Sequence, residues 1–182
     1  SAGQLAHNMG ENADALPALA AAEQVFAALD DERGLAAVLN ELAWVHFDTH
    51  DNDAAVAAFE GCIARVRRFD EPAWLAALLS STAMVLGYTD RSDPRIRAYF
   101  NQASELHAAV DNPSGRAHAL MQLAIVEGLD GAYARASALA EEAVDVLAPI
   151  ALPRDLAWAY EVAGETRWFC GDLDGAEDAY RC

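Results

Sequence analysis

The chain of 182 residues contains no lysine: all 12 of its basic residues are arginines, set against 29 acidic residues, and the formal net charge is −17. A phosphate-binding loop of the GxxxxGK[ST] type requires a lysine and is therefore excluded. Nucleic acids and anionic membranes carry negative charge and should be repelled by so acidic a surface. The composition instead favours a protein or peptide partner of basic or amphipathic character.

Cysteine is also scarce. Cys62, Cys170 and Cys182 are scattered and odd in number, which does not fit a disulfide framework and suits a reducing cytoplasm. No apolar run is long enough to span a membrane, and the N-terminus lacks the pattern of a signal peptide. Segments rich in Val, Ile and Thr with a period of two are missing, so β-strands are not indicated. We therefore expect a cytoplasmic, all-α protein whose abundant alanine lets helices approach closely.

An internal repeat of about 40 residues runs through the chain. Small residues recur with steps of 40, 40, 41 and 40 at Gly3, Ala43, Ala83, Ala124 and Gly164. A second series in the same register holds Leu19, Phe59, Phe100, Ala140 and Tyr180, and a third holds Ala22, Cys62, Ala103 and Ala143. Three series that share one register indicate a structural repeat rather than chance.

Each repeat unit is predicted to contain two helices. In the second unit, Asp31 precedes a helix that runs to about Asp48, and another helix follows from about Asp53 to Arg68. Asp is a favoured residue before a first turn because it accepts bonds from free backbone N–H groups. Short inner turns make the helices antiparallel neighbours, so we predict an α-α superhelix, or solenoid, of antiparallel helix pairs. We expect one domain over 1–182, a piece of a longer protein, with units at about 1–30, 31–70, 71–112, 113–152 and 153–182.

The stretch HFDTHDND in the second unit is either a metal site or a turn. His46 and His50 are four residues apart among several Asp residues, and could bind zinc or nickel if a third ligand arrived. The stretch occupies the place of the other inner turns, RSDPRI, GLDGAY and GDLDGA, each of which supplies Asp just before the second helix. An acid there complements the positive end of the helix. We prefer the turn, and predict no metal and no cofactor.

Residue sets typical of catalysis are missing. The sequence contains no GxSxG, CxxC or HExxH motif. Paired carboxylates occur, but Glu141–Glu142 and Asp30–Asp31 lie where solvated helix faces and caps are expected. We therefore predict that the chain is not an enzyme.

The repeat resembles the tetratricopeptide (TPR) repeat. The second unit carries the family's spacing of small and aromatic residues as Leu42-Ala43, Ala55, Phe59 and Cys62; the fourth as Leu123-Ala124, Ala136, Ala140 and Ala143; and the fifth as Ala163-Gly164, Ala176 and Tyr180. The third unit departs from it, because one residue is inserted in its turn and Ile96 replaces the Ala. The period is longer than the family's 34 residues, so longer helices are expected.

A narrower resemblance lies between the units. DDERGLAAVLNELAWV and DNPSGRAHALMQLAIV share a pattern when aligned on Asp30 and Asp111, and are similar to the repeat arms of large bacterial LuxR-type and antibiotic-type transcriptional regulators. The resemblance implies an arm that senses an effector or partner protein. The final unit carries Trp168, Phe169 and Tyr180 without a polar cap, so we also expect self-association through an open repeat end.

The resemblance further implies a concave groove lined by the first helix of each unit. Carried over from the small-residue register, the groove residues are Asn40, Trp44, Asp48, Ser80, Met84, Tyr88, His118, Met121, Ile125, Trp158, Glu161, Glu165 and Trp168. Aromatic anchors with adaptable Met suit a bound peptide or helix. For Trp44 and Trp158 the alternative is that they fill core space, since large aromatics usually serve packing.

Three functions remain open at this point. The preferred one is a protein-interaction or sensing module of a larger bacterial regulatory protein, which binds a peptide or protein in its groove. The second is a repeat domain that binds a small-molecule effector. The third, and least favoured, is an enzyme with a metal site at His46 and His50.

Overall fold

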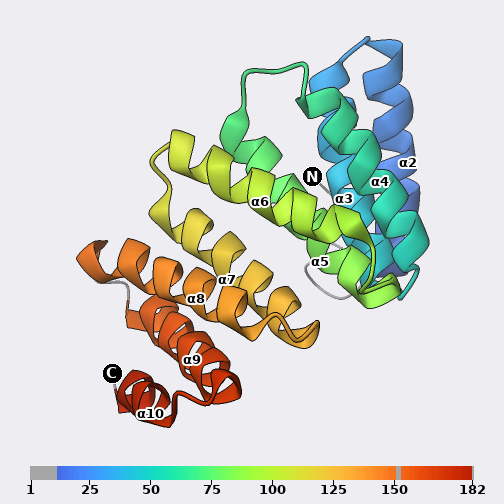
Figure 1. Cartoon of the computed structure of the whole chain (residues 1–182). Coiled ribbons are helices and arrows are strands. Elements are labelled where there is room, and N and C mark those ends of the chain that lie inside the picture. Colours follow the sequence, from blue (N-terminus) through green and yellow to red (C-terminus); the bar gives the residue numbers. More distant parts are fainter. Residues whose placement is uncertain (1–11, 151–152, 182) are drawn as a thin grey trace. The chain divides into compact units, whose positions relative to one another are not determined.

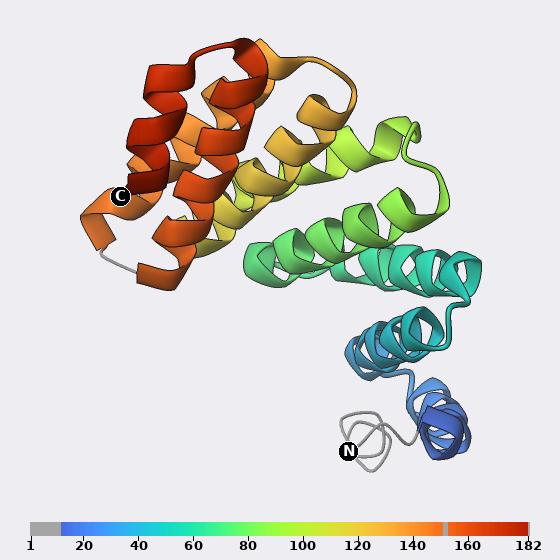
Figure 2. The ribbon, with the colours of Figure 1, turned by 90° about the horizontal axis from the view of Figure 1, so that it is seen from below.

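The computed structural model describes residues 12–150 and 153–181, and all regular structure in these ranges is helical (Figures 1 and 2). The helices are α2 (Asn12–Ala28), α3 (Glu32–Asp48), α4 (Asn52–Val66), α5 (Pro72–Thr89), α6 (Pro94–Ala109), α7 (Pro113–Leu129), α8 (Tyr133–Leu147), the short 3-10 helix η1 (Ala148–Ile150), α9 (Pro153–Cys170) and α10 (Leu173–Arg181). The all-α prediction is confirmed. None of these helices is long and apolar enough to cross a membrane.

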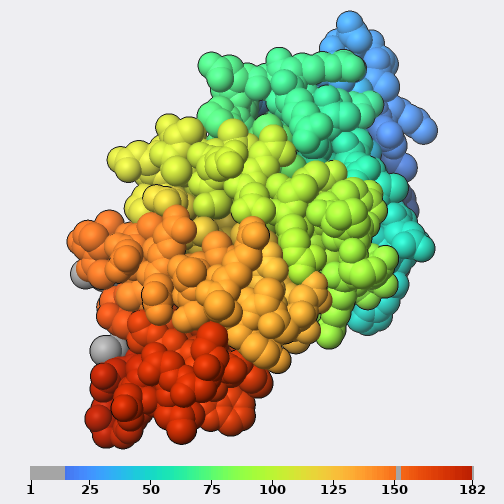
Figure 3. Space-filling view, viewed as in Figure 1, coloured from blue at the N-terminus to red at the C-terminus, as the bar shows by residue number. Residues whose placement is uncertain are grey.

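Two compact units form, one ending at Ile96 and the other beginning at Arg97, close to the start of α6. In the first unit α2 packs on α3, α3 on α4 and α4 on α5. In the second unit α8 packs on α7 and α9, and α10 packs on α9. The surface of this second unit shows α6, α8 and α10 as successive bands, from yellow-green through orange to red (Figure 3). That one repeat domain spans 1–182 stays a prediction.

The repeat register marks buried positions. Ala43, Ala83, Ala124 and Gly164 are all buried, whereas Gly3 lies outside the described residues. The positions twelve residues further on, at Ala55, Ala136 and Ala176, are buried as well, and so is Ile96, which lies thirteen residues after Ala83 because of the inserted residue. Of the second series Leu19, Phe59, Phe100 and Ala140 are buried, but Tyr180 is 56% exposed. Since small residues stand where consecutive helices come close, the 40-residue pattern is a packing pattern.

Five helix ends share one turn geometry. A residue with positive φ follows the helix at Asp30, His50, Asp111, Gly131 and Gly171. In each case its N–H donates to the carbonyl three residues earlier, and the next N–H donates to the carbonyl five residues earlier. This is the Schellman pattern, which satisfies the last free carbonyls of a helix. α5 ends differently, because the inserted residue leaves Asp90 extended, with Ser92 donating to its carboxylate at 2.6 Å.

Aspartates in the turns before second helices act as N-caps for these helices. Asp51 Oδ1 accepts the Ala54 N–H at 3.2 Å, Asp172 Oδ1 accepts the Gly175 N–H at 3.0 Å, and Asp93 Oδ1 accepts the Arg95 N–H at 2.8 Å. These contacts agree with the interpretation of the inner-turn acids as caps. The turn GLDGAY differs, because α8 begins after Ala132 without a side-chain cap and Asp130 pairs with Arg97 instead.

A buried carboxylate ties three helices of the second unit together. Glu127, near the end of α7, is only 5% exposed. Its Oε1 lies 3.3 Å from Arg97 Nε of α6 and 3.2 Å from Arg135 Nε of α8. An acid can be buried here because two cations and their N–H groups compensate its lost hydration.

Candidate functional site

The histidines of HFDTHDND do not form a metal centre in this structure. His50 is exposed and occupies the positive-φ position of a Schellman turn, with φ 63°. His46 Nδ1 lies 3.9 Å from Asp51 Oδ2, and Asp51 is engaged in capping α4. Across 12–150 and 153–181, no three His, Cys, Asp or Glu residues are grouped so that they could hold a metal ion. The structural role of the turn accounts for its residues.

In the first unit several of the predicted groove residues are partly buried by contacts within the protein. Asn40, Ser80, Trp44 and Met84 are half-buried, whereas Asp48 and Tyr88 are exposed. The Trp44 ring stands edge-on to Phe59, with centroids 5.3 Å apart, and to Phe47, at 6.0 Å. Trp44 therefore fills space between α3 and α4 and offers only part of its surface to a ligand.

An open hollow lies beside these aromatics, at the ends of α3 and α5. It has a volume of about 440 Å³ and is lined by Phe47, Asp48, His50, Asn52 and Tyr88. The rings of Phe47 and Tyr88 contact each other at 5.5 Å. The hollow lies at helix ends and a turn, and it is less apolar than the site in the second unit described below.

In the second unit the predicted residues divide into core and surface. Met121 is 1% exposed and belongs to a core cluster with Ala117, Leu120, Ala143, Leu147 and Ala159. It cannot line an open groove, so its assignment was wrong. Ile125 and Trp158 are half-buried, and His118, Glu161, Glu165 and Trp168 are exposed. Trp158 packs on the core and against the His118 ring, with ring centroids 5.2 Å apart. It therefore contributes to packing more than to an exposed binding surface.

His118, which contacts this tryptophan, also affects the pKa of His107. Burial lowers the pKa of His107, and the nearby His118 lowers it further. Loss of water around His118 lowers the pKa of that side chain too, although part of it is exposed. The Asp155 carboxylate acts in the opposite direction and raises the pKa of His118. Ser114 Oγ donates to Asp155 at 2.8 Å, so this carboxylate is already engaged. Both pKa shifts favour the neutral form of the histidine.

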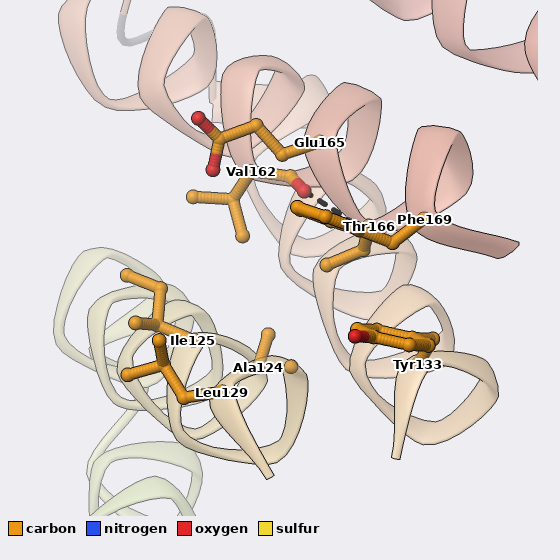
Figure 4. Close-up of a pocket in the computed structure, with 9 residues that line it drawn as sticks. Ala124, Ile125, Leu129, Tyr133, Val162, Glu165, Thr166 and Phe169 are labelled. Atoms are coloured by element: carbon orange, nitrogen blue, oxygen red, sulfur yellow. Dashed lines mark hydrogen bonds between the residues drawn. The ribbon is translucent and has the colours of Figure 1, made fainter. Parts of the chain in front are cut away.

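An apolar pocket of about 260 Å³ lies between α7 and α9 (Figure 4). α7 contributes Ala124, Ile125, Gly128 and Leu129, α9 contributes Val162, Glu165, Thr166 and Phe169, and α8 contributes its first residue, Tyr133. The helical spacing of three and four residues brings each set to one face of its helix. The Thr166 hydroxyl donates to the Val162 and Ala163 carbonyls at 3.0 and 3.1 Å. Thr166 therefore has no free polar donor for a ligand.

Aromatic rings form one side of the pocket. Tyr133 and Phe169 stack with centroids 5.3 Å apart and an angle of 11° between their planes. Trp168 stands edge-on to Phe169 at 4.9 Å. Phe169, Trp168 and Leu129 are each more than half exposed. Large apolar side chains with this exposure around a hollow are typical of an interaction site.

Of the nine residues that line this pocket, the sequence predicted only Ile125 and Glu165 as groove residues. The large apolar side chains that it missed include Leu129, Tyr133 and Phe169. Two of them carried a signal. Asp48 and Tyr88 had been placed five residues after the small residue of their units, and the same offset from Ala124 and Gly164 gives Leu129 and Phe169. In the fourth and fifth units the predicted groove residues begin at His118 and Trp158, one helical turn earlier relative to the small residue than in the second and third units. Tyr133 lies on a second helix, which the groove assignment did not include.

Negative charge borders the pocket on one side. Glu165 is the only charged residue in the lining, and Glu161 lies one turn earlier on α9. Burial raises the pKa of Tyr180, and the carboxylates of Glu165 and Glu161 raise it further. A cation is therefore favoured on this side and an anion is disfavoured.

The chain has structural relatives although its sequence has no close match. No family model matches it, and no curated protein matches it. The apo form of RapI superposes with a TM-score of 0.88 at 15% identity, over 98% of this chain and 65% of RapI. PH0952 from Pyrococcus horikoshii, a signal-transduction ATPase (STAND) protein with a tetratricopeptide repeat sensor, gives 0.87 at 14% identity, over 97% of this chain and 28% of that protein.

BtubC from P. vanneervenii gives a TM-score of 0.85 at 18% identity, over 98% of this chain and 74% of BtubC. Identities this low show the fold alone. The chain is an all-α, TPR-like solenoid of antiparallel helix pairs, as its 40-residue register predicted. Its partner has to be argued from the site.

Proposed function

We propose that this chain is a protein-interaction or sensing module of a larger regulatory protein, without a catalytic role, and that it binds a peptide segment on the faces of α7 and α9. The observation that carries the proposal is the apolar α7–α9 pocket with exposed Leu129 and Phe169 at its edge. An exposed aromatic and an exposed aliphatic residue at one hollow are what an anchor side chain of a partner would contact. The resemblance to repeat arms of LuxR-type regulators, and the TPR sensor of the STAND protein, support a regulatory setting in the cytoplasm.

The size of the pocket favours a peptide over a small-molecule effector. Pockets that enclose a small ligand usually measure about 300–1,000 Å³ and bury most of its surface. The α7–α9 pocket, at about 260 Å³, is smaller than this range and open. It suits one side chain of a longer partner, whose remaining contacts lie outside the pocket.

Selection of displayed random peptides on the purified chain tests this proposal. Binding of an enriched peptide is then compared between the unchanged chain and two variants, Leu129→Gln and Leu173→Gln. The two leucines are 63% and 62% exposed, but only Leu129 lines the pocket. We expect Leu129→Gln to weaken binding at least fivefold and Leu173→Gln to leave it unchanged. Equal affinities for both variants, or no enriched peptide, would reject the α7–α9 site.

A further inference from the structure

The charges around the α7–α9 pocket indicate what the peptide carries beside its anchor. This inference rests on the proposed function and specifies the partner. We infer that the peptide presents an aliphatic or aromatic side chain to the pocket and, next to it, an arginine or lysine to the Glu165 carboxylate.

Glu165 and Glu161 take part in no ion pair among the described residues. Several other acids of the second unit are paired: Glu127 with Arg97 and Arg135, Glu142 with Arg116, and Glu141 with Arg167. In a protein with 29 acids and 12 cations, unpaired acids are expected on the surface. These two differ because they lie on one face of α9, beside an exposed apolar pocket.

Arg135 and Arg167 each follow a pocket residue by two positions, and both have partners elsewhere. Arg167, two residues after Glu165, is directed to Glu141 and to the Gly175 carbonyl. Arg135 contacts Glu127, and no arginine lines the pocket. A bound cation would therefore meet two carboxylates without displacing an internal partner.

The arrangement of the lining places the two parts of the ligand next to each other. Ile125 and Leu129 of α7 face Val162 of α9 across the apolar part of the pocket, and the Glu165 carboxylate lies beside Val162 at the edge away from Tyr133 and Phe169 (Figure 4). If the anchor side chain of the peptide occupies the apolar part of the pocket, the neighbouring residue of the peptide lies at the edge formed by Glu165. Aromatic faces also attract cations, so a basic residue on the opposite side of the anchor would contact the ring stack.

A charge series of synthetic peptides tests the inference. The probes are acetyl-Ala-Ala-Leu-Xaa-Ala-Ala-amide with arginine, citrulline or glutamate at Xaa; citrulline is the neutral isostere of arginine. Affinities are measured by NMR titration of the whole chain at low and moderate salt. We expect the arginine peptide to bind roughly twofold to fivefold more tightly than the citrulline peptide, as one exposed ion pair allows, and the glutamate peptide to bind most weakly. The advantage of arginine should shrink with added salt.

Two variants of equal charge locate the effect. Glu165→Gln and Glu142→Gln each remove one negative charge, but Glu142 is paired with Arg116 on α7 and does not line the pocket. We expect the advantage of arginine to disappear in Glu165→Gln and to persist in Glu142→Gln. Equal losses in both variants would show general attraction to an acidic surface and would overturn the inference.

The remaining outcomes separate this inference from the proposed function. If the three peptides bind equally and shift resonances of Leu129 and Phe169, the site binds an apolar anchor alone, and only the basic residue is rejected. If no pocket resonance shifts with any peptide, both proposals fail. Leucinamide, a small cation with the same anchor, should bind at least tenfold more weakly than the arginine peptide. Equal binding would identify a small amine as the ligand and overturn the inference.

Discussion

The phenol ring of Tyr180 lies over Gly164: a methyl group added to Gly164 would come within 2.8 Å of Cε1 and Cζ of that ring. Carbon atoms in contact are normally separated by about 3.5–4.0 Å. The repeat register places a small residue at 164 and a large one at 180, and the structure shows that the two positions touch. A side chain at position 164 would require the Tyr180 ring to shift, whereas the backbone itself does not demand glycine, since Gly164 does not have positive φ.

Substitution of Gly164 should therefore destabilise the contact between α9 and α10. A helical Gly→Ala change usually stabilises by about 0.5–1 kcal/mol, and Gly87→Ala, which meets no atom within 4 Å, should show this gain. Gly164→Ala should not, and Gly164→Leu should cost about 1–3 kcal/mol through overpacking. Urea unfolding of the three variants measures the differences. A gain in Gly164→Ala equal to that in Gly87→Ala would contradict the contact.

His50 should be replaceable by glycine without loss of stability. Its φ of 63° costs an L-residue about 1–2 kcal/mol relative to right-handed backbone, and glycine stands at the same turn position at 131 and 171. We expect His50→Gly to be as stable as the unchanged chain or up to about 1 kcal/mol more stable, and His50→Val to be less stable. Thermal unfolding with and without zinc checks both points. Zinc stabilisation of the unchanged chain that His50→Gly abolishes would restore the metal site.

Low pH should reduce the stability of the second unit through protonation of His107. Asn112 Oδ1 accepts the Gly115 N–H at 3.0 Å, which leaves the Asn112 amide group to donate to His107 Nδ1 at 3.2 Å. This assigns an unprotonated Nδ1, and a proton there would break the contact with the residue that caps α7. The His107 side chain is neutral above its unfolded-state pKa of about 6.5 in both states, so pH has little effect there.

Below that value the unfolded chain binds a proton that the folded chain resists, because burial lowers the pKa of His107 in the folded state. Stability should therefore fall as pH decreases below about 6.5. His107→Asn keeps an acceptor near the Nδ1 position and should flatten this part of the curve. The measurement is the free energy of unfolding between pH 5 and 8. An unchanged slope in His107→Asn would assign the effect to other groups, such as His118.

Cys62 should stay unreactive until the first unit unfolds. It is fully buried, its thiol donates to the Ala36 carbonyl at 3.1 Å, and burial raises its pKa to about 12. At pH 8 only about one molecule in ten thousand would carry the reactive thiolate. In a Cys182→Ser background, a thiol reagent should modify the exposed Cys170 quickly and Cys62 only in urea. Two fast thiols in native protein would contradict the packing of α4 on α3.

Periodicity predicted the buried small residues of this chain, but not most of the residues that line its α7–α9 pocket. Ala43, Ala83 and Ala124 could be predicted as buried because a repeated helix contact requires a small residue at the same place in every unit. Caps such as Asp51 and Asp172 were predictable because their hydrogen bonds are local. Both features depend on short-range geometry that the sequence repeats.

The site depends on longer-range details. Met121 was assigned to the groove, yet it is buried, because α7 packs on both α8 and α9 and residues of these helices, such as Leu147 and Ala159, enclose the Met121 side chain. The Tyr133–Phe169 stack joins the start of one helix to the end of another, and only the packing of α8 on α9 brings these rings together. Asp130 has the spacing of a cap but pairs with Arg97 from a different helix.

The packing of consecutive helices also bears on how the chain emerges from the ribosome. Within the two units α3, α4 and α5, and then α8, α9 and α10, each pack on the helix made just before, and helices such as α3 and α7 are 17 residues long. At synthesis rates of about 5–20 residues per second, such a helix is completed in roughly 1–4 seconds. Helix formation itself takes about a microsecond. The apolar face of a newly made helix is therefore left uncovered only for the few seconds until the next helix is synthesised, which limits the time in which nascent chains can aggregate.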